Sequence, residues 1–207
     1  MDNITRRNLG MAYIADEAVN EQMKTTRSLV HRFNMTDPEN EKLLQDLICR
    51  ILGESGENIW INQPFYCDYG KHITVGNNFF ANYNCTILDV AQVKIGNNVF
   101  FAPNVSLYTA GHPLHHEARN SMYEYGAPIS IGDNVWIGGN SVVTPGVSIG
   151  ANSVIGAGSV VTKDIPSGVV AAGNPCRVIR KITSEDKKYY YKDRVFDDEA
   201  WQKINEK

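Results

Sequence analysis

Three of the five histidines lie close together in the stretch TAGHPLHHEARNSMYEYGAP, residues 109–128, and they are His112, His115 and His116. An imidazole can accept a proton from a hydroxyl near neutral pH, so one of them could be a general base. Imidazole is also a common zinc ligand, and the H-x-x-H-H spacing could hold a metal ion if a subunit interface supplied further ligands. A solvated loop that is merely rich in histidine is the third interpretation. The spacing alone leaves all three open.

A six-residue repeat follows this loop and runs from Ile131 to Pro166 as IGDNVW, IGGNSV, VTPGVS, IGANSV, IGAGSV and VTKDIP. Each block opens on Ile or Val and has a small or aliphatic residue at its fifth place. A period of six fits neither a helix nor an alternating strand, but it fits a solenoid in which each hexad makes one short strand and one corner. Three hexads would close a coil of about eighteen residues, stacked on its neighbours at ~4.8 Å. The repeat therefore predicts a parallel β-helix whose opening residues point inward and whose Gly, Asn and Asp form the corners.

The same repeat is present, less regularly, before the histidine-rich loop. Hexads open at Ile61, Cys67, Val75, Ala81, Ile87, Ile95, Phe101 and Leu107. The phase slips by two residues between Cys67 and Val75 and again between Ile87 and Ile95, which two-residue extensions at corners would absorb. Residues 109–128 are then expected to form a loop that projects from one corner of the solenoid. Catalytic and binding residues often lie on such loops, which a rigid scaffold holds in place.

Both ends of the chain differ from the repeat. Residues from about 5 to 52 are expected to form helices that cap one end of the solenoid, since an uncovered sheet edge invites pairing with other chains. Thr36-Asp37-Pro38 is interpreted as a helix start, and the apolar stripe from Leu43 to Leu52 as the buried face of that helix, which Gly53 ends. The charged, tyrosine-rich segment from Ser184 is expected to be a helix capped by Ser184. The predicted division is a helical cap at 1–56, a β-helix domain at 57–182 and a helical tail at 183–207.

The composition bounds the function only broadly. A chain of 207 residues with 43% hydrophobic and 21% charged residues can build the core of one domain. Its net charge of −3 gives no reason to expect nucleic acid or an anionic membrane as a partner. The first residues, MDNITRRNLGMAYIADE, lack the apolar stretch of a signal peptide, so a cytoplasmic location is expected. The four cysteines form no C-x-x-C pair and are expected to be reduced structural thiols.

The hexads, the GHPLHHEARN loop, the FFANYN block, the YIADE segment and the stretch IGAGSVVTKDIPSGVVAAGNPCRVIR together resemble the hexapeptide-repeat acetyltransferases. Within that family the chain most resembles the galactoside and maltose O-acetyltransferases, over nearly its whole length. The resemblance implies a left-handed β-helix, a hand that the repeat itself does not give. It also implies acetyl-CoA as co-substrate without a required metal, a small sugar as acceptor, and a homotrimer with active sites between subunits.

Two residues match the family's catalytic positions. His112 matches the general base, which would take the proton from a sugar hydroxyl as it attacks the acetyl thioester. Asn82 matches the residue that stabilises the tetrahedral oxyanion. Without the resemblance, Asn82 would be interpreted as a corner asparagine.

Other positions match residues that hold the two substrates. For acetyl-CoA the resemblance implies small residues that leave room for the pantetheine arm and cations that face its phosphates, namely Trp136, Gly139, Ala157, Thr162, Lys163, Arg177 and Arg180. For the sugar it implies carboxylates that bind hydroxyls, namely Asp16, Asp68 and Asp89. The galactoside type has serine at the place of Asp68 and a second acid at the place of Val90, whereas the maltose type has CDYG and DV as this chain does. These two positions favour glucose or maltose as the acceptor, and a galactoside remains the alternative.

Three alternatives remain open from the sequence. The same fold could acetylate a xenobiotic such as a streptogramin antibiotic. A zinc-dependent β-helix of the carbonic anhydrase kind would use the histidines as ligands, and a scaffold without catalytic activity would use none of them.

Overall fold

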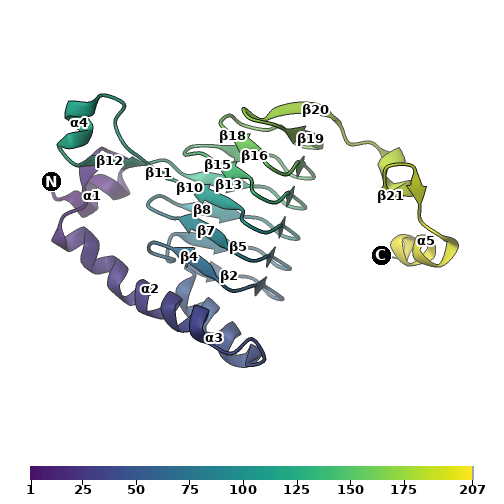
Figure 1. Ribbon diagram of the computed structural model, residues 1–207, viewed down its shortest axis with the longest axis horizontal. Helices are drawn as coiled ribbons and strands as arrows, with labels where there is room; N and C mark the ends of the chain where they lie inside the picture. Colours follow the sequence, from purple (N-terminus) through teal and green to yellow (C-terminus); the bar gives the residue numbers. More distant parts are fainter. Residues whose placement is uncertain (207) are drawn as a thin grey trace.

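Short strands stack in three sheets around a three-sided prism (Figure 1) in the computed structural model, which describes residues 1–206. Sheet 1 has the order β16 (Ser148–Ile149), β13 (Ile129–Ile131), β8 (Val93–Ile95), β5 (Ile73–Val75), β2 (Glu54–Ser55). Sheet 2 has the order β20 (Arg177–Lys181), β19 (Val169–Ala172), β17 (Val154–Ile155), β14 (Trp136–Ile137), β9 (Phe100–Phe101), β6 (Phe80–Ala81), β3 (Trp60–Ile61). Sheet 3 has the order β18 (Val160–Val161), β15 (Val142–Val143), β10 (Ser106–Tyr108), β7 (Cys85–Leu88), β4 (Phe65–Cys67). Every pairing within these sheets is parallel except that of β20 with β19, so the predicted parallel β-helix is confirmed.

The strand registers show how the repeat and its irregularities fold. Ile131 pairs with Ile149, eighteen positions later, as three hexads per coil require. Phe80 pairs with Phe100, twenty positions later, so the two-residue extensions expected between earlier hexads are present. The solenoid begins slightly earlier than predicted, because β2 is already a strand of sheet 1.

The hexad positions divide between core and corner. The residues that open the six regular hexads are all at most 3% exposed, and those at the fifth place at most 5%. The corner falls on the fourth place, where Asn134, Asn140 and Asn152 have φ between 58° and 60°; asparagine tolerates this left-handed conformation better than most residues. The glycine at the second place has a different reason: a Cβ on Gly138 would lie 2.5 Å from the backbone nitrogen of Ala157 in the next coil.

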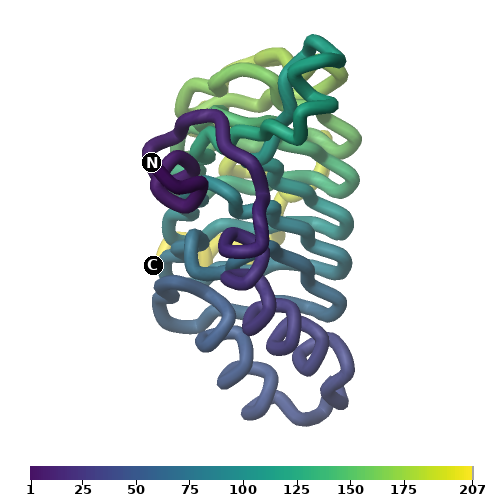
Figure 2. The backbone as a smooth tube through the Cα atoms, turned by 90° about the vertical axis from the view of Figure 1, so that its left-hand side faces the viewer, coloured from purple at the N-terminus to yellow at the C-terminus, as the bar shows by residue number. Residues whose placement is uncertain are grey.

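Two helices close the lower end of the prism, as expected (Figures 1 and 2): α2 (Glu17–Met35) and α3 (Glu41–Ile51). The buried face of α3, with Leu44, Leu47, Ile48 and Ile51, joins the same apolar core as the solenoid. The cap is thus continuous with the β-helix, and it removes the end of the core from water.

The predicted start of this helix was wrong. Thr36 is the C-cap of α2, because that helix continues to Met35, and Asn40 is the N-cap of α3, with its Oδ1 accepting a hydrogen bond from the backbone N–H of Leu43. Proline at position 38 therefore lies in the turn between two helices.

The C-terminal segment also differs from the single helix expected from Ser184. It forms a 3₁₀ turn, η1 (Ser184–Lys188), then a hairpin of β21 (Tyr189–Tyr191) and β22 (Arg194–Val195), and only then α5 (Asp198–Asn205). Thr183 rather than Ser184 is the N-cap, with the Asp186 carboxylate accepting from its backbone N–H, and the turn ends where Tyr189 becomes extended (φ −110°, ψ 136°). The segment extends away from the prism (Figure 1), and Lys207 lies outside the described residues.

Two further findings concern the sequence expectations. All four cysteines are free thiols, as expected. Among residues 1–206, no helix has the length and apolar character needed to cross a membrane.

Candidate active site

The histidine-rich loop is a folded arm at the corner where the chain passes from sheet 3 to sheet 1, called here the sheet 3–1 corner (Figure 1). It consists of β11 (Ala110–Gly111), α4 (His116–Asn120) and β12 (Tyr123–Gly126). Strand β12 pairs antiparallel with β11 on one side and with β1 (Tyr13–Ile14) on the other. The N-terminal segment, which begins with α1 (Asn3–Asn8), therefore holds the arm, and sequence reasoning missed this pairing because two residues of strand carry almost no pattern.

His112 directly follows β11 at the base of the arm. Its side chain is exposed, and its Nδ1 lies 3.3 Å from the backbone carbonyl oxygen of Tyr123. A carbonyl can only accept, so Nδ1 carries the proton and Nε2 is left as the acceptor. This is the tautomer that a general base acting through Nε2 needs.

The other two histidines of the arm point elsewhere. His115 and His116 are exposed and stack on each other with ring centroids 4.7 Å apart, and His115 Nδ1 lies 4.0 Å from the carboxylate of Glu117. Within the part of the chain that the structure describes, no group of three His, Cys, Asp or Glu side chains is arranged to hold a metal.

Asp89, expected to bind a sugar, has a structural role in this chain. Its side chain has no exposed surface, and its carboxylate accepts hydrogen bonds from the backbone N–H groups of Asp68 (3.0 Å), Tyr69 (2.9 Å) and His72 (3.3 Å). A buried carboxylate satisfied in this way orders the segment 68–72. The sequence could not show this, because the bonds join residues about twenty positions apart.

Asp68 is positioned by that segment and is partly exposed. Burial, with the nearby charge of Asp89 as a further cause, raises the pKa of Asp68 to about 6. Burial and the negative charge of Glu124 likewise raise the pKa of Tyr13, which pairs with Glu124 across β1 and β12. Acidic and hydroxyl groups thus gather beside the base of the arm, where they could bind sugar hydroxyls.

Asp16 has a structural role. One carboxylate oxygen accepts from the Val19 backbone N–H (3.0 Å), which caps α2, and the other accepts from the Asn3 side chain (2.8 Å). These bonds lower the pKa of Asp16. Each carboxylate oxygen thus has one hydrogen-bond partner within the chain. Capping α2 is a structural role that explains aspartate at position 16 without a bound sugar.

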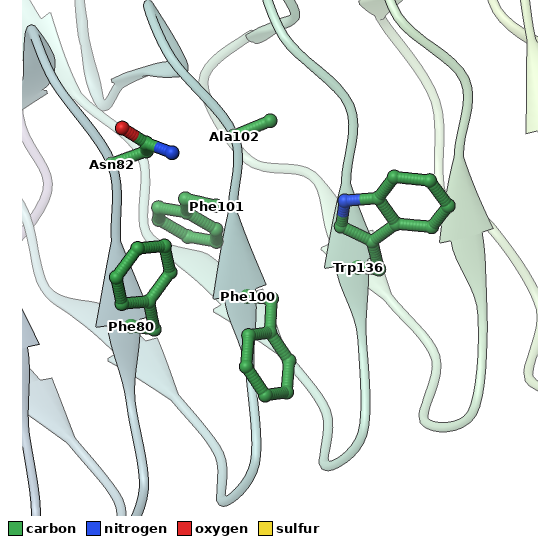
Figure 3. A pocket seen from close by; sticks show the side chains of 6 residues that line it. All are labelled: Phe80, Asn82, Phe100, Phe101, Ala102 and Trp136. Carbon is green, nitrogen blue, oxygen red and sulfur yellow. The ribbon is translucent and has the colours of Figure 1, made fainter. Parts of the chain in front are cut away.

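Asn82 lies on a different side of the prism, in an aromatic groove of about 390 Å³ along sheet 2 (Figure 3). The groove is lined by Phe80, Asn82, Phe100, Phe101, Ala102 and Trp136. Asn82 Oδ1 accepts from the Tyr83 backbone N–H at 2.8 Å, which fixes the amide, and its Nδ2 has no acceptor among residues 1–206. The corner conformation belongs to Asn84, with φ 59°, so Asn82 is not the corner asparagine that the repeat suggested. A fixed amide with an unused donor can bind an oxyanion.

The positions expected to hold acetyl-CoA fall into two groups. Trp136, Gly139 and Ala157 lie along sheet 2 or just past it, where the chain turns toward sheet 3, on the same side of the prism as Asn82. Arg177 and Arg180 lie on β20 at the upper end of that sheet.

The second group, Thr162 and Lys163, directly follows β18 at the sheet 3–1 corner, which is the corner of the arm, and both residues are exposed. A single chain therefore does not bring His112 and Asn82 together, and it divides the residues expected to bind acetyl-CoA between the same two sides of the prism.

Arg180, in the first group, is already paired. It donates to the Asp186 carboxylate at 2.7 and 2.9 Å, and this pairing raises the pKa of Arg180 and lowers the pKa of Asp186 to about 2.

Comparison with known proteins agrees with this architecture. Residues 128–163 match the family model described as the hexapeptide repeat of succinyl-transferase. The chain is 51% identical over 177 residues to the galactoside O-acetyltransferase of Escherichia coli, covering 86% of this chain and 87% of the relative.

Two solved structures extend the likeness to the fold. A galactoside acetyltransferase in complex with coenzyme A superposes with a TM-score of 0.92 at 47% identity, covering 95% of this chain and 99% of that one. A maltose O-acetyltransferase from Clostridium difficile 630 gives a TM-score of 0.87 at 49% identity, covering 89% and 99%.

The chain belongs to the hexapeptide-repeat acetyltransferase family, and its coil is the left-handed β-helix of that family. It is an acetyltransferase of the type whose members are named for galactosides and maltose.

Proposed function

We propose that the protein transfers the acetyl group of acetyl-CoA to a hydroxyl of a small sugar. The observation that carries this proposal is the similarity, over 95% of the chain, to a galactoside acetyltransferase in complex with coenzyme A. Within this chain, a histidine with an unused Nε2 and an asparagine with an unused Nδ2 supply the two groups that the reaction needs.

The proposed chemistry follows from these two groups. The sugar oxygen attacks the thioester carbonyl carbon while His112 Nε2 takes the hydroxyl proton. The carbonyl oxygen becomes an oxyanion, which Asn82 Nδ2 stabilises by a hydrogen bond. Collapse of the intermediate breaks the carbon–sulfur bond, and the proton on His112 passes to the departing thiolate of coenzyme A.

We further propose a homotrimer in which the arm of one subunit meets the aromatic groove of the next. The two catalytic residues lie on different sides of one prism, and so do the two groups of donor-binding residues. A cyclic assembly places the sheet 3–1 corner of one subunit against sheet 2 of its neighbour at every interface. His112, Thr162 and Lys163 would then face Asn82, Trp136 and Arg177 across the interface, with the pantetheine arm between them.

The acceptor side is proposed to be built around Asp68. It is partly exposed and lies in the CDYG segment that Asp89 orders, beside the base of the arm. A carboxylate there favours a hydroxyl-rich acceptor such as glucose or maltose.

The test is release of free thiol from acetyl-CoA in the presence of glucose, maltose, galactosides and a streptogramin antibiotic. The proposal expects release with at least one sugar, and loss of that release in His112→Ala and Asn82→Ala. Release with the antibiotic alone would contradict it. Sugar acetylation that disappears on chelation and returns with zinc would contradict the assigned chemistry.

A further inference from the structure

The N-terminal segment lies against the arm (Figure 1), and the strand registers show which part of β12 it holds. Strand β11 pairs only with the second half of β12, residues 125–126. The first half consists of Tyr123 and Glu124. Its only strand partner among residues 1–206 is β1, in which Ile14 lies opposite Tyr123. Tyr13 lies opposite Glu124.

This first half of β12 carries the group that orients the candidate general base. The Tyr123 carbonyl oxygen lies 3.3 Å from His112 Nδ1, and this contact leaves Nε2 as the free nitrogen. In the part of the chain that the structure describes, the imidazole makes no other hydrogen bond. The orientation of His112 therefore depends on β1, although β1 lies far from His112 in the sequence.

Tyr13 anchors β1 in the interior of the protein. Only 1% of its surface is exposed, and it belongs to a buried cluster that is separate from the core of the solenoid. The other buried members of this cluster are Val19 and Met23 of α2, Tyr69 and Val90. The cluster thus joins the N-terminal segment to the coil beside the base of the arm.

Tyr69 connects this cluster to the acceptor side of the proposed site. It directly follows Asp68, and its backbone N–H donates to the buried Asp89 carboxylate at 2.9 Å. The guanidinium of Arg7, in α1, lies 4.5 Å from the centroid of the Tyr69 ring, within the range of a cation–π contact. The N-terminal segment therefore contacts both the strand that orients His112 and the residue next to Asp68.

We propose that Tyr13 is a positioning residue for acetyl transfer, because it holds the general base and the acceptor-binding carboxylate at a fixed separation. The inference rests on the proposed function, in which His112 and Asp68 meet the same sugar. Tyr13 itself contacts neither substrate and acts through the Tyr123 carbonyl and through Tyr69. A displacement of about 1 Å at the reacting atoms can lower a rate roughly a hundredfold, so the effect of this positioning is measurable.

The experiment compares three variants in steady-state thiol release, each with the sugar that the wild type acetylates. Tyr13→Ala should lower kcat/KM for the sugar roughly 10–100-fold, with little change in the KM for acetyl-CoA. Tyr13→Phe keeps the ring and should retain most of the activity. Met23→Ala is the matched control, because Met23 belongs to the same cluster but lies on α2 and pairs with no strand of the arm. It should lower the melting temperature about as much as Tyr13→Ala does, without the loss of kcat/KM.

Native-state hydrogen exchange tests the same positioning without any acceptor. The backbone amides of residues 123–124 and 68–69 should exchange faster in Tyr13→Ala than in Met23→Ala, since β12 and the acceptor segment lose their common support. If the wild type releases no thiol with any sugar, the proposed function fails, while the exchange rates still decide whether Tyr13 holds the two segments.

A second variant guards against a folding defect in Tyr13→Ala. Asn3 Oδ1 accepts a hydrogen bond from the Ile14 backbone N–H at 3.0 Å, and Asn3 is only partly buried. Asn3→Ala therefore frees β1 without opening a cavity in the core, and it should show the same pattern to a smaller extent. The proposal is overturned if an active Tyr13→Ala loses no more kcat/KM than Met23→Ala, or if the amides of residues 123–124 exchange equally in both.

Discussion

Mixing two inactive variants should restore activity, because the proposed active site takes His112 from one subunit and Asn82 from the next. His112→Ala alone should retain no more than about one hundredth of the activity, the low end of the effect of a lost general base. Asn82→Ala should fall at least as far, by roughly 10²–10³-fold. A mixed trimer holds the two variants in a ratio of 2:1 or 1:2, and in both cases one of its three interfaces pairs an intact His112 with an intact Asn82. Random mixing of equal amounts therefore leaves about one quarter of all sites intact.

The assay is thiol release from the whole population of trimers after the two variants are co-expressed in equal amounts. A rise from about one hundredth to about one quarter of wild-type activity is expected, roughly 25-fold. Wild type mixed with the double variant is the matched control. It should also give about one quarter if sites are shared between subunits, but about one half if each chain holds its own site. Mixed trimers that stay as inactive as their parents would refute the reasoning.

Three further predictions test separate parts of the account. His112→Asn should lower kcat at least about a hundredfold with little change in the affinity for acetyl-CoA, whereas His115→Ala should lower kcat much less. If steady-state kinetics gave the larger loss of kcat for His115→Ala, the general base would be a later residue of the arm. Ile137→Ala removes a fully buried residue that stacks between coils and should lower the free energy of unfolding by about 2–5 kcal/mol in urea titrations, and a loss below about 1 kcal/mol would contradict the packed core. The pKa of the Asp68 carboxyl is raised to about 6 in the folded state, so the folded chain binds this proton more tightly than the unfolded chain does. Protonated Asp68 therefore contributes its full share of the folding stability below about pH 4, and this contribution is lost as the pH rises through about 6. Asp68→Asn should therefore be more stable than wild type at pH 8 but not at pH 4, while the same change at the exposed Asp193 should give no such difference.

The hexapeptide pattern was a reliable guide to the core, because each side chain's direction is set by its place within one coil. Ile131, Ile137 and Val143 could be assigned to the interior without knowing any distant contact, and all three are buried. The two-residue slips were also readable, since a coil absorbs an insertion at its corner without disturbing the strands above and below. Prediction from local sequence failed at the termini. Thr36 and Ser184 have side chains that can cap a helix, but α2 continues up to Thr36, and the chain after Ser184 forms a 3₁₀ turn instead of an α-helix.

By itself the sequence determined the parallel β-helix, its coil length, its inward-facing residues and the position of the arm, because these follow from a repeat that acts over six residues. Only the tertiary structure decided which side of the prism each polar residue occupies. That side depends on the accumulated phase of the coil, so His112 and Asn82 proved to lie apart within one chain. The role of a polar residue also depends on contacts between segments far apart in the chain. The Asp89 carboxylate accepts hydrogen bonds from backbone N–H groups, and Arg7 is buried against the ring of Tyr69. Such roles come from the desolvation of a charge by its neighbours in space, which no spacing along the chain encodes.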